Sequence, residues 1–155
     1  MIIYIGADHK GFSLKQILKQ YMVDLGYEVV DVGNVEYAQD DDYVDYAMAG
    51  VKTISQDPAL GKGVLICGSG VGMAIAANKF RNIRASLCFS PDHAMVARAE
   101  DDANILVLPA EFIDEDTAKK ITSVWFSTQF KNEERYQRRL KKLSELELKT
   151  TNYFE

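Results

Sequence analysis

Short runs of apolar residues alternate along the chain with longer segments whose apolar positions recur every three or four residues. The short runs show little alternation between apolar and polar positions, which is typical of strands covered on both faces. We therefore predict strands at residues 2–6, 28–32, 63–67, 84–89 and 104–108.

The longer segments predict helices. The first carries an apolar stripe from Leu14 to Leu25, and Gly26 stands where a helix commonly ends. Pro91 fits the first position of a later helix. Further helices are predicted at residues 43–54, 70–80, 92–100, 117–128 and 133–147.

Strand–helix alternation of this kind predicts the α/β class, here a three-layer, doubly wound, five-stranded parallel sheet (Rossmann-like) with a C-terminal helical extension. The 155 residues suit one domain, which we place at residues 1–147, with a frayed polar tail at 148–155. Ligands of such folds bind at the carboxyl ends of the strands, near the point where the strand order reverses. The chemistry should lie at residues 6–11, 67–72 or 100–104.

The net charge of −5 argues against generic binding to nucleic acid or to anionic membranes. No apolar stretch approaches the roughly 18 residues of a membrane span. Cys67 and Cys88 each lie within an apolar run and lack the spacing of a disulfide framework. These features predict a reduced, cytoplasmic protein.

The strongest local signal is the sequence ICGSGVG at residues 66–72, where a strand runs through a glycine loop into a helix. It is not a Walker A loop, because no Gly-Lys-Ser/Thr follows, and a dinucleotide fingerprint belongs after the first strand. Its N–H groups suit an anion, either a phosphate or an oxyanion that develops during a reaction. The plain alternative is a tight turn set by packing.

Three side chains at predicted strand ends are candidates for proton transfer. Cys67 lies beside a helix N-terminus, which favours the thiolate and predicts a base or nucleophile, unless it is an inert core cysteine, as we expect for Cys88. Asp8 and His9 follow the first strand and suit binding of hydroxyls, proton transfer or binding of phosphate. Alternatively, Asp8 only caps a helix and His9 lies on the surface.

Arg135 and Arg139 lie four residues apart, on one face of the last predicted helix. Two guanidinium groups on one stripe suit a phosphate, although spacing alone favours a solvated basic face in this Arg- and Lys-rich segment. The acidic run at residues 40–42 is predicted to be a hydrated loop.

In order along nearly the whole chain, these motifs resemble the ribose-5-phosphate isomerase B family, which includes the galactose-6-phosphate isomerase subunits. The resemblance implies isomerisation of ribose 5-phosphate and ribulose 5-phosphate, a step of the pentose phosphate pathway. The proton would move between C1 and C2 through a cis-enediolate, without a metal or an organic cofactor. The residues that carry the resemblance are GADHKGF at 6–12 with Leu14 and Lys15, CGSGVG at 67–72, AANK at 76–79, IRA at 83–85, Arg135 and Arg139.

The resemblance also implies roles for individual residues. Cys67 stands where type-B members keep the base, and Met73 stands where other relatives carry a glutamate base. Asp8, His9 and Tyr43 would bind the sugar, and Asp8 and Ser69 would also be catalytic. The cradle for the enediolate oxygen would comprise Gly68, Ser69, Gly70, Val71 and Gly72.

The resemblance further implies that Arg135 and Arg139 clamp the phosphate across the interface of a homodimer, or within a tetramer. Glu100 and Asp101 stand where the family has His-Asn, whose histidine opens the furanose ring; Glu100 would be catalytic and Asp101 would bind the substrate. Glu100 serves this step only if burial raises its pKa. Glu111 replaces an arginine that binds phosphate in many relatives. These differences leave three alternatives open: a hexose 6-phosphate, a tetrose phosphate, or a non-catalytic sugar-phosphate-binding subunit.

Overall fold

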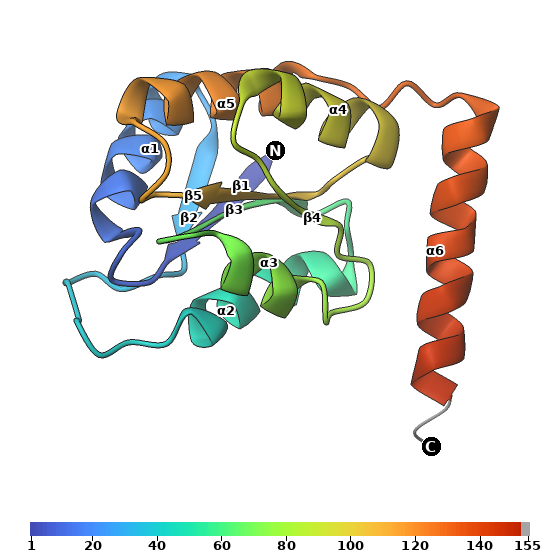
Figure 1. Ribbon diagram of the computed structural model, residues 1–155, viewed down its shortest axis with the longest axis horizontal. Coiled ribbons are helices and arrows are strands. Elements are labelled where there is room, and N and C mark those ends of the chain that lie inside the picture. The colour runs from blue at the N-terminus through green and yellow to red at the C-terminus, as the bar shows by residue number, and fades with distance from the viewer. Residues whose placement is uncertain (153–155) are drawn as a thin grey trace.

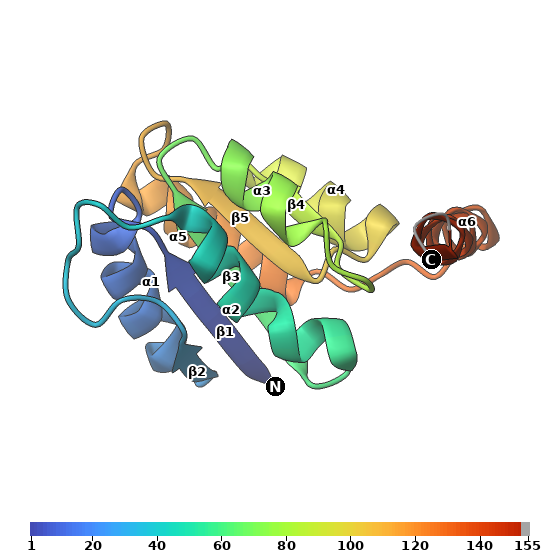
Figure 2. The ribbon, with the colours of Figure 1, turned by 90° about the horizontal axis from the view of Figure 1, so that it is seen from below.

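The computed structural model describes residues 1–152, which form a parallel sheet with helices on both faces (Figures 1 and 2). The sheet has the strand order β2-β1-β3-β5-β4, and all of its pairings are parallel. The predicted three-layer, doubly wound fold is therefore confirmed. The strands are β1 (Ile2–Ala7), β2 (Glu28–Asp31), β3 (Gly61–Cys67), β4 (Ala85–Leu87) and β5 (Ile105–Pro109).

Five helices cover the sheet and a sixth stands apart from it (Figure 1). One face carries α1 (Phe12–Asp24), α4 (Pro91–Asp101) and α5 (Glu115–Ser127), and the other carries α2 (Tyr43–Gln56) and α3 (Val71–Ala77). The last helix, α6 (Glu134–Asn152), lies beyond the β4 edge, at the end of an extended connection.

Several predicted boundaries differ from the structure, among them the end of the last helix and both ends of the fourth strand. The last helix was predicted to end at residue 147 but continues to Asn152, since Leu148 and Lys149 are good helix formers. Residues 153–155, the end of the predicted tail, lie outside the described part. The strand expected at residues 84–89 is only Ala85–Leu87. On the outer edge of this strand, the Asn78 side chain accepts from the Ala85 N–H at 2.8 Å and donates to the Ala85 carbonyl at 2.9 Å. The side-chain amide of Asn78 thus satisfies the outer N–H and carbonyl of Ala85, which a further strand would otherwise pair with.

Burial on both faces explains why the strands lack an alternating pattern. Along β3, Val64 and Ile66 belong to the core beneath α1, α4 and α5, whereas Leu65 and Cys67 belong to the core beneath α2 and α3. Successive side chains of a strand point to opposite faces, so a strand between two cores is apolar at every position. The same geometry directs the Cys67 thiol toward the α2 and α3 face.

The strand order reverses between β1 and β3. Each of these strands leads into a helix, and α1 and α3 lie on opposite faces of the sheet. Ala7 pairs with Ile66, so Asp8 and Cys67 leave the sheet side by side. Connections that diverge from adjacent strands leave a crevice at their carboxyl ends, and this is where doubly wound folds bind ligands.

Lys15 ties α1 to the end of β2. Its side chain is fully buried, and its ammonium donates to Asp31 Oδ1 at 2.8 Å and to the Asn34 carbonyl at 2.6 Å. Lys19 also reaches Asp31, at 3.1 Å, but 40% of its side chain is exposed. The buried lysine therefore anchors the loop that leaves β2.

Replacing Lys15 by Met should destabilise the protein by about 3 kcal/mol, the low end for removing one partner of a buried ion pair, because the Asp31 side chain is 16% exposed. The matched variant Lys19→Met should cost less than about 1 kcal/mol, since water screens that pair. Equal costs in urea unfolding would contradict this assignment.

The cost of Lys15→Met should also fall in acid. Burial raises the pKa of Asp31, but hydrogen bonds from Lys15, the Gly33 amide and Lys19 outweigh it and hold the pKa below its ordinary value. A carboxyl with a lowered folded pKa stabilises the protein at neutral pH, and that contribution disappears as the pH falls below about 4. The difference between wild type and variant should shrink over this range.

Candidate active site

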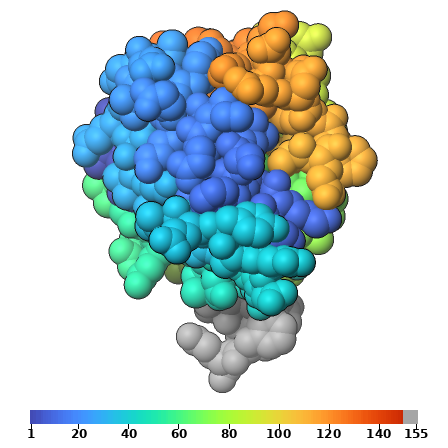
Figure 3. Space-filling view, turned by 90° about the vertical axis from the view of Figure 1, so that its left-hand side faces the viewer, coloured from blue at the N-terminus to red at the C-terminus, as the bar shows by residue number. Residues whose placement is uncertain are grey.

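A cavity of about 290 Å³ opens at the carboxyl ends of β1 and β3. In the space-filling view of this end of the molecule, the blue segment after β1 lies between the cyan loop after β2 and the orange segment after β5 (Figure 3). The fold thus brings predicted site residues that are distant in sequence to the same cavity. The lining residues are Asp8, His9, Lys10, Tyr43, Cys67, Gly68, Ser69, Gly72 and Glu111.

Cys67 lines this cavity although only 4% of the residue is exposed. The Gly70 N–H donates to its sulfur at 3.2 Å. Burial raises the pKa of Cys67, and the amides of Met73, Gly70 and Ser69 offset only part of that rise. The expectation that the helix end favours the thiolate was therefore wrong for the net balance, because desolvation exceeds the effect of the amides.

The glycine loop is bent by Gly70, which has a φ of +76°. A side chain rarely adopts this left-handed conformation, and a Cβ here would also press on the tip of the Leu87 side chain, so glycine is strongly favoured. Gly70 and Val71, both predicted for the cradle, do not line the cavity. The Gly70 N–H faces the sulfur, and the Val71 N–H donates to Ser69 Oγ at 3.3 Å.

Asp8 serves both the fold and the cavity. Its Oδ1 accepts from the N–H groups of Lys10 and Gly11, each at 3.0 Å, and so shapes the turn into α1. Burial raises the pKa of Asp8 in spite of these two bonds. Asp8 therefore shapes the turn before α1 and lines the cavity at the same time.

His9 is held by Asp41, which the sequence did not identify as a site residue. Asp41 Oδ1 accepts from the His9 amide at 2.9 Å and lies 2.7 Å from His9 Nδ1, while Asp41 Oδ2 accepts from Asn34 at 3.0 Å. A carboxylate at Nδ1 fixes the proton there and leaves Nε2 for a ligand. Burial raises the pKa of Asp41, but hydrogen bonds from the His9 amide and ring outweigh it and lower the pKa below its ordinary value.

The acidic run at residues 40–42 was predicted to be hydrated, which is wrong for Asp41, whose side chain is 7% exposed. No local pattern announces its contact with His9, because the two residues are 32 positions apart. Lys10 and Glu111 were also not predicted as binding residues, yet both line the cavity.

Glu100, Arg135 and Arg139 form a second cluster that does not line the Cys67 cavity. Its centre is Tyr136, which is 1% exposed and hydrogen-bonds to both Glu100 and Arg135. The guanidinium of Arg135 lies 4.4 Å from the Tyr136 ring centroid and that of Arg139 lies 5.8 Å from it. Within one chain, the predicted phosphate clamp is therefore separate from the predicted base.

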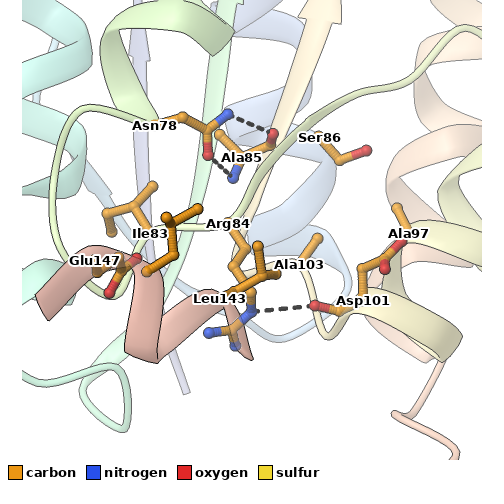
Figure 4. Close-up of a pocket in the computed structure, with 11 residues that line it drawn as sticks. Asn78, Ile83, Arg84, Ala85, Ser86, Ala97, Asp101, Ala103, Leu143 and Glu147 are labelled. Carbon is orange, nitrogen blue, oxygen red and sulfur yellow. Dashed lines mark hydrogen bonds between the residues drawn. The ribbon is translucent and has the colours of Figure 1, made fainter. Parts of the chain in front are cut away.

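Asp101 lines a different cavity, of about 430 Å³, between the β4 edge and α6 (Figure 4). Arg84 Nε donates to the Asp101 carbonyl at 3.1 Å, and Leu143 of α6 lies over this region. The structure thus does not bring Asp101 to Cys67 within one chain.

Within residues 1–152, neither a metal site nor a membrane-spanning helix is present. No group of three or more His, Cys, Asp or Glu side chains is placed to hold a metal ion. None of the helices in this range has the length and apolar character needed to cross a membrane.

Comparison with known proteins adds independent information. Residues 3–143 match the family model described as Ribose/Galactose Isomerase. The chain is 36% identical over 145 residues to ribose-5-phosphate isomerase B of Escherichia coli, covering 94% of this chain and 95% of the relative. It is 34% identical over 148 residues to the probable ribose-5-phosphate isomerase B of Mycoplasma genitalium, covering 96% and 97%.

Solved structures agree with these sequence matches. The Mycoplasma genitalium ribose-5-phosphate isomerase B with bound ribulose-5-phosphate has a TM-score of 0.91 and 34% identity, over 94% of this chain and 95% of that one. The Thermotoga maritima ribose 5-phosphate isomerase has a TM-score of 0.87 and 43% identity, over 93% and 97%.

Alkylation tests the electrostatics of Cys67. Because burial raises its pKa, its reaction with iodoacetamide should be slow at neutral pH and should accelerate through a pKa above the ordinary thiol value of about 8.5. Mass spectrometry of a Cys88→Ala variant would follow Cys67 alone. A rate already maximal at pH 7 would contradict the assignment.

Proposed function

Because the chain belongs to the ribose/galactose isomerase family, we propose that it interconverts ribose 5-phosphate and ribulose 5-phosphate through a cis-enediolate, with Cys67 as the base. The chain is an aldose–ketose isomerase, and relatives of similar length carry the ribose-5-phosphate isomerase B name. The single observation that carries the role of Cys67 is that its thiol lines one cavity with the glycine loop, Asp8 and His9.

The chemistry needs a base, a stabiliser for negative charge and a group that orients the carbon chain. In our proposal the Cys67 thiolate removes the C2 proton of the open-chain aldose and returns a proton to C1. The Ser69 hydroxyl and the loop amides at 68, 69 and 72 donate hydrogen bonds to the enediolate oxygen and so stabilise its negative charge. A raised pKa makes the thiolate scarcer but also a stronger base, in accordance with Brønsted behaviour.

Met73 supports the choice of Cys67. The resemblance places it where other relatives carry a glutamate base, and its side chain is fully buried in the core beneath the loop. No carboxylate is therefore available there. Asp8 and His9 line the same cavity and are proposed to bind the sugar hydroxyls.

Cys67→Ala should lower kcat by about 10²–10⁴-fold, the usual contribution of a general base, in a coupled assay with ribose 5-phosphate. The matched variant Cys88→Ala should retain activity, because Cys88 is fully buried and does not line the cavity. Full activity of Cys67→Ala would refute the assigned base.

We further propose that the active site is completed by a second copy of the chain. Arg135 and Arg139 lie on α6, apart from the Cys67 cavity, so they cannot bind a phosphate there within one chain. Leu143, Leu146 and Leu148 of the same helix are 46%, 56% and 51% exposed, which is a surface suited to a partner. In a symmetric dimer each α6 can serve the cavity of the other copy, as can Glu100.

Mixing two inactive variants tests the shared site. In a heterodimer of Cys67→Ala and Arg139→Ala, one site carries both changes and the other carries neither. Random reassociation should therefore restore up to about a quarter of wild-type activity if the sites are shared across a twofold axis. If each site lies within one chain, no activity should return.

A cytoplasmic location is the remaining part of the proposal. It is supported by Cys67 and Cys88, which are both free, as expected for a protein in a reducing compartment.

A further inference from the structure

Lys10 and Glu111 meet at the rim of the candidate active site. Lys10 Nζ lies 2.8 Å from Glu111 Oε1, and the two side chains are 49% and 50% exposed. They come from different strand ends, since Lys10 follows β1 and Glu111 follows β5. They cross over Gly68, where a Cβ would lie 2.6 Å from Lys10 Cδ and 2.7 Å from Glu111 Oε2. The ion pair therefore bridges the glycine loop.

Among the residues that line this cavity, Lys10 is the one lysine, and there is no arginine. The other charged or titratable groups there are Asp8, His9, Tyr43, Cys67 and Glu111, and His9 is already paired with Asp41. The hydrogen bond with Glu111 raises the pKa of Lys10, and the nearby Asp8 and Cys67 act in the same direction. The ammonium thus carries its charge throughout the neutral range.

A phosphate can readily replace Glu111 as the partner of the Lys10 ammonium. Water screens an ion pair between two half-exposed side chains, so such a bond contributes little. A phosphate dianion offers more charge and several acceptor oxygens, and charge-assisted hydrogen bonds to it are stronger. The lysine stem rotates freely, so the ammonium can turn from one acceptor to the other.

We propose that Lys10 is the cation that each chain contributes to its own phosphate site, and that Glu111 holds it at the rim until the phosphate replaces the carboxylate. This inference rests on the proposed function, since it assigns the phosphate end of that substrate. Glu111 then has a second effect: once released, its carboxylate repels the dianion and weakens phosphate binding. Glu111 therefore positions the Lys10 ammonium before phosphate binds, but it lowers the affinity for phosphate.

The test compares Lys10→Met and Glu111→Gln by the KM for ribose 5-phosphate and by calorimetric binding of inorganic phosphate. Lys10→Met should weaken both about tenfold, with little change in kcat, because the cation binds ground state and transition state alike. Glu111→Gln should tighten phosphate binding. This gain should be larger with Lys10 present than in the Lys10→Met background, because only then is a cation released.

Two controls separate a local contact from a general charge effect. Lys19→Met makes the same change of charge at a residue that does not line the cavity, so its phosphate binding should equal that of wild type. Lys10→Arg should retain most of the phosphate affinity, because it keeps the cation.

The outcomes distinguish this inference from the proposed function. If the wild type isomerises ribose 5-phosphate but Lys10→Met leaves both KM and phosphate binding unchanged, the inference is wrong and the function stands. If the wild type binds phosphate through Lys10 but does not isomerise the sugar, the proposed function is wrong and the phosphate site stands.

Discussion

Two opposing influences act on the sulfur of Cys67 at the end of β3. Burial disfavours the thiolate, while the amides of the glycine loop favour it. This balance requires the sulfur to be close to α3, shielded from bulk water and still in contact with a cavity. The reversal of strand order meets all three demands, because β1 and β3 end together and their helices lie on opposite faces. The fold and the proposed chemistry are connected through this one position.

Lys10 and His9, the two basic side chains that line the cavity, each contact a carboxylate. Lys10 contacts Glu111, and His9 contacts Asp41, so each group that suits binding of an anion already has a carboxylate partner. The arginines of α6 are likewise held in their own cluster, around Tyr136. A paired cation keeps its charge and its position before the substrate arrives, which lowers the entropic cost of binding. A site completed by α6 of a second chain would bring the two sets together only upon assembly.

The amino-acid sequence predicted the features that are local. Apolar runs without alternation identified the strands, and the glycine loop identified the end of β3, because both patterns arise from neighbouring residues. The role of Asp41 was not predictable, since its contact with His9 depends on a loop returning over the end of β1. The pKa of Cys67 was misjudged for a similar reason: the loop amides are visible in the sequence, but the depth of burial is a property of the packed core. The engagement of Glu100 by Tyr136 likewise arises only when α6 folds back toward α4.

The most direct test of the account follows hydrogen at C1 of ribulose 5-phosphate by NMR in heavy water. Proton abstraction by a single thiolate through an enediolate predicts that the enzyme introduces solvent deuterium at one of the two C1 positions, and that Cys67→Ala abolishes this exchange. Deuterium that still enters C1 in the Cys67→Ala variant would mean that another group moves the proton, and the account of Cys67 as the base would be wrong.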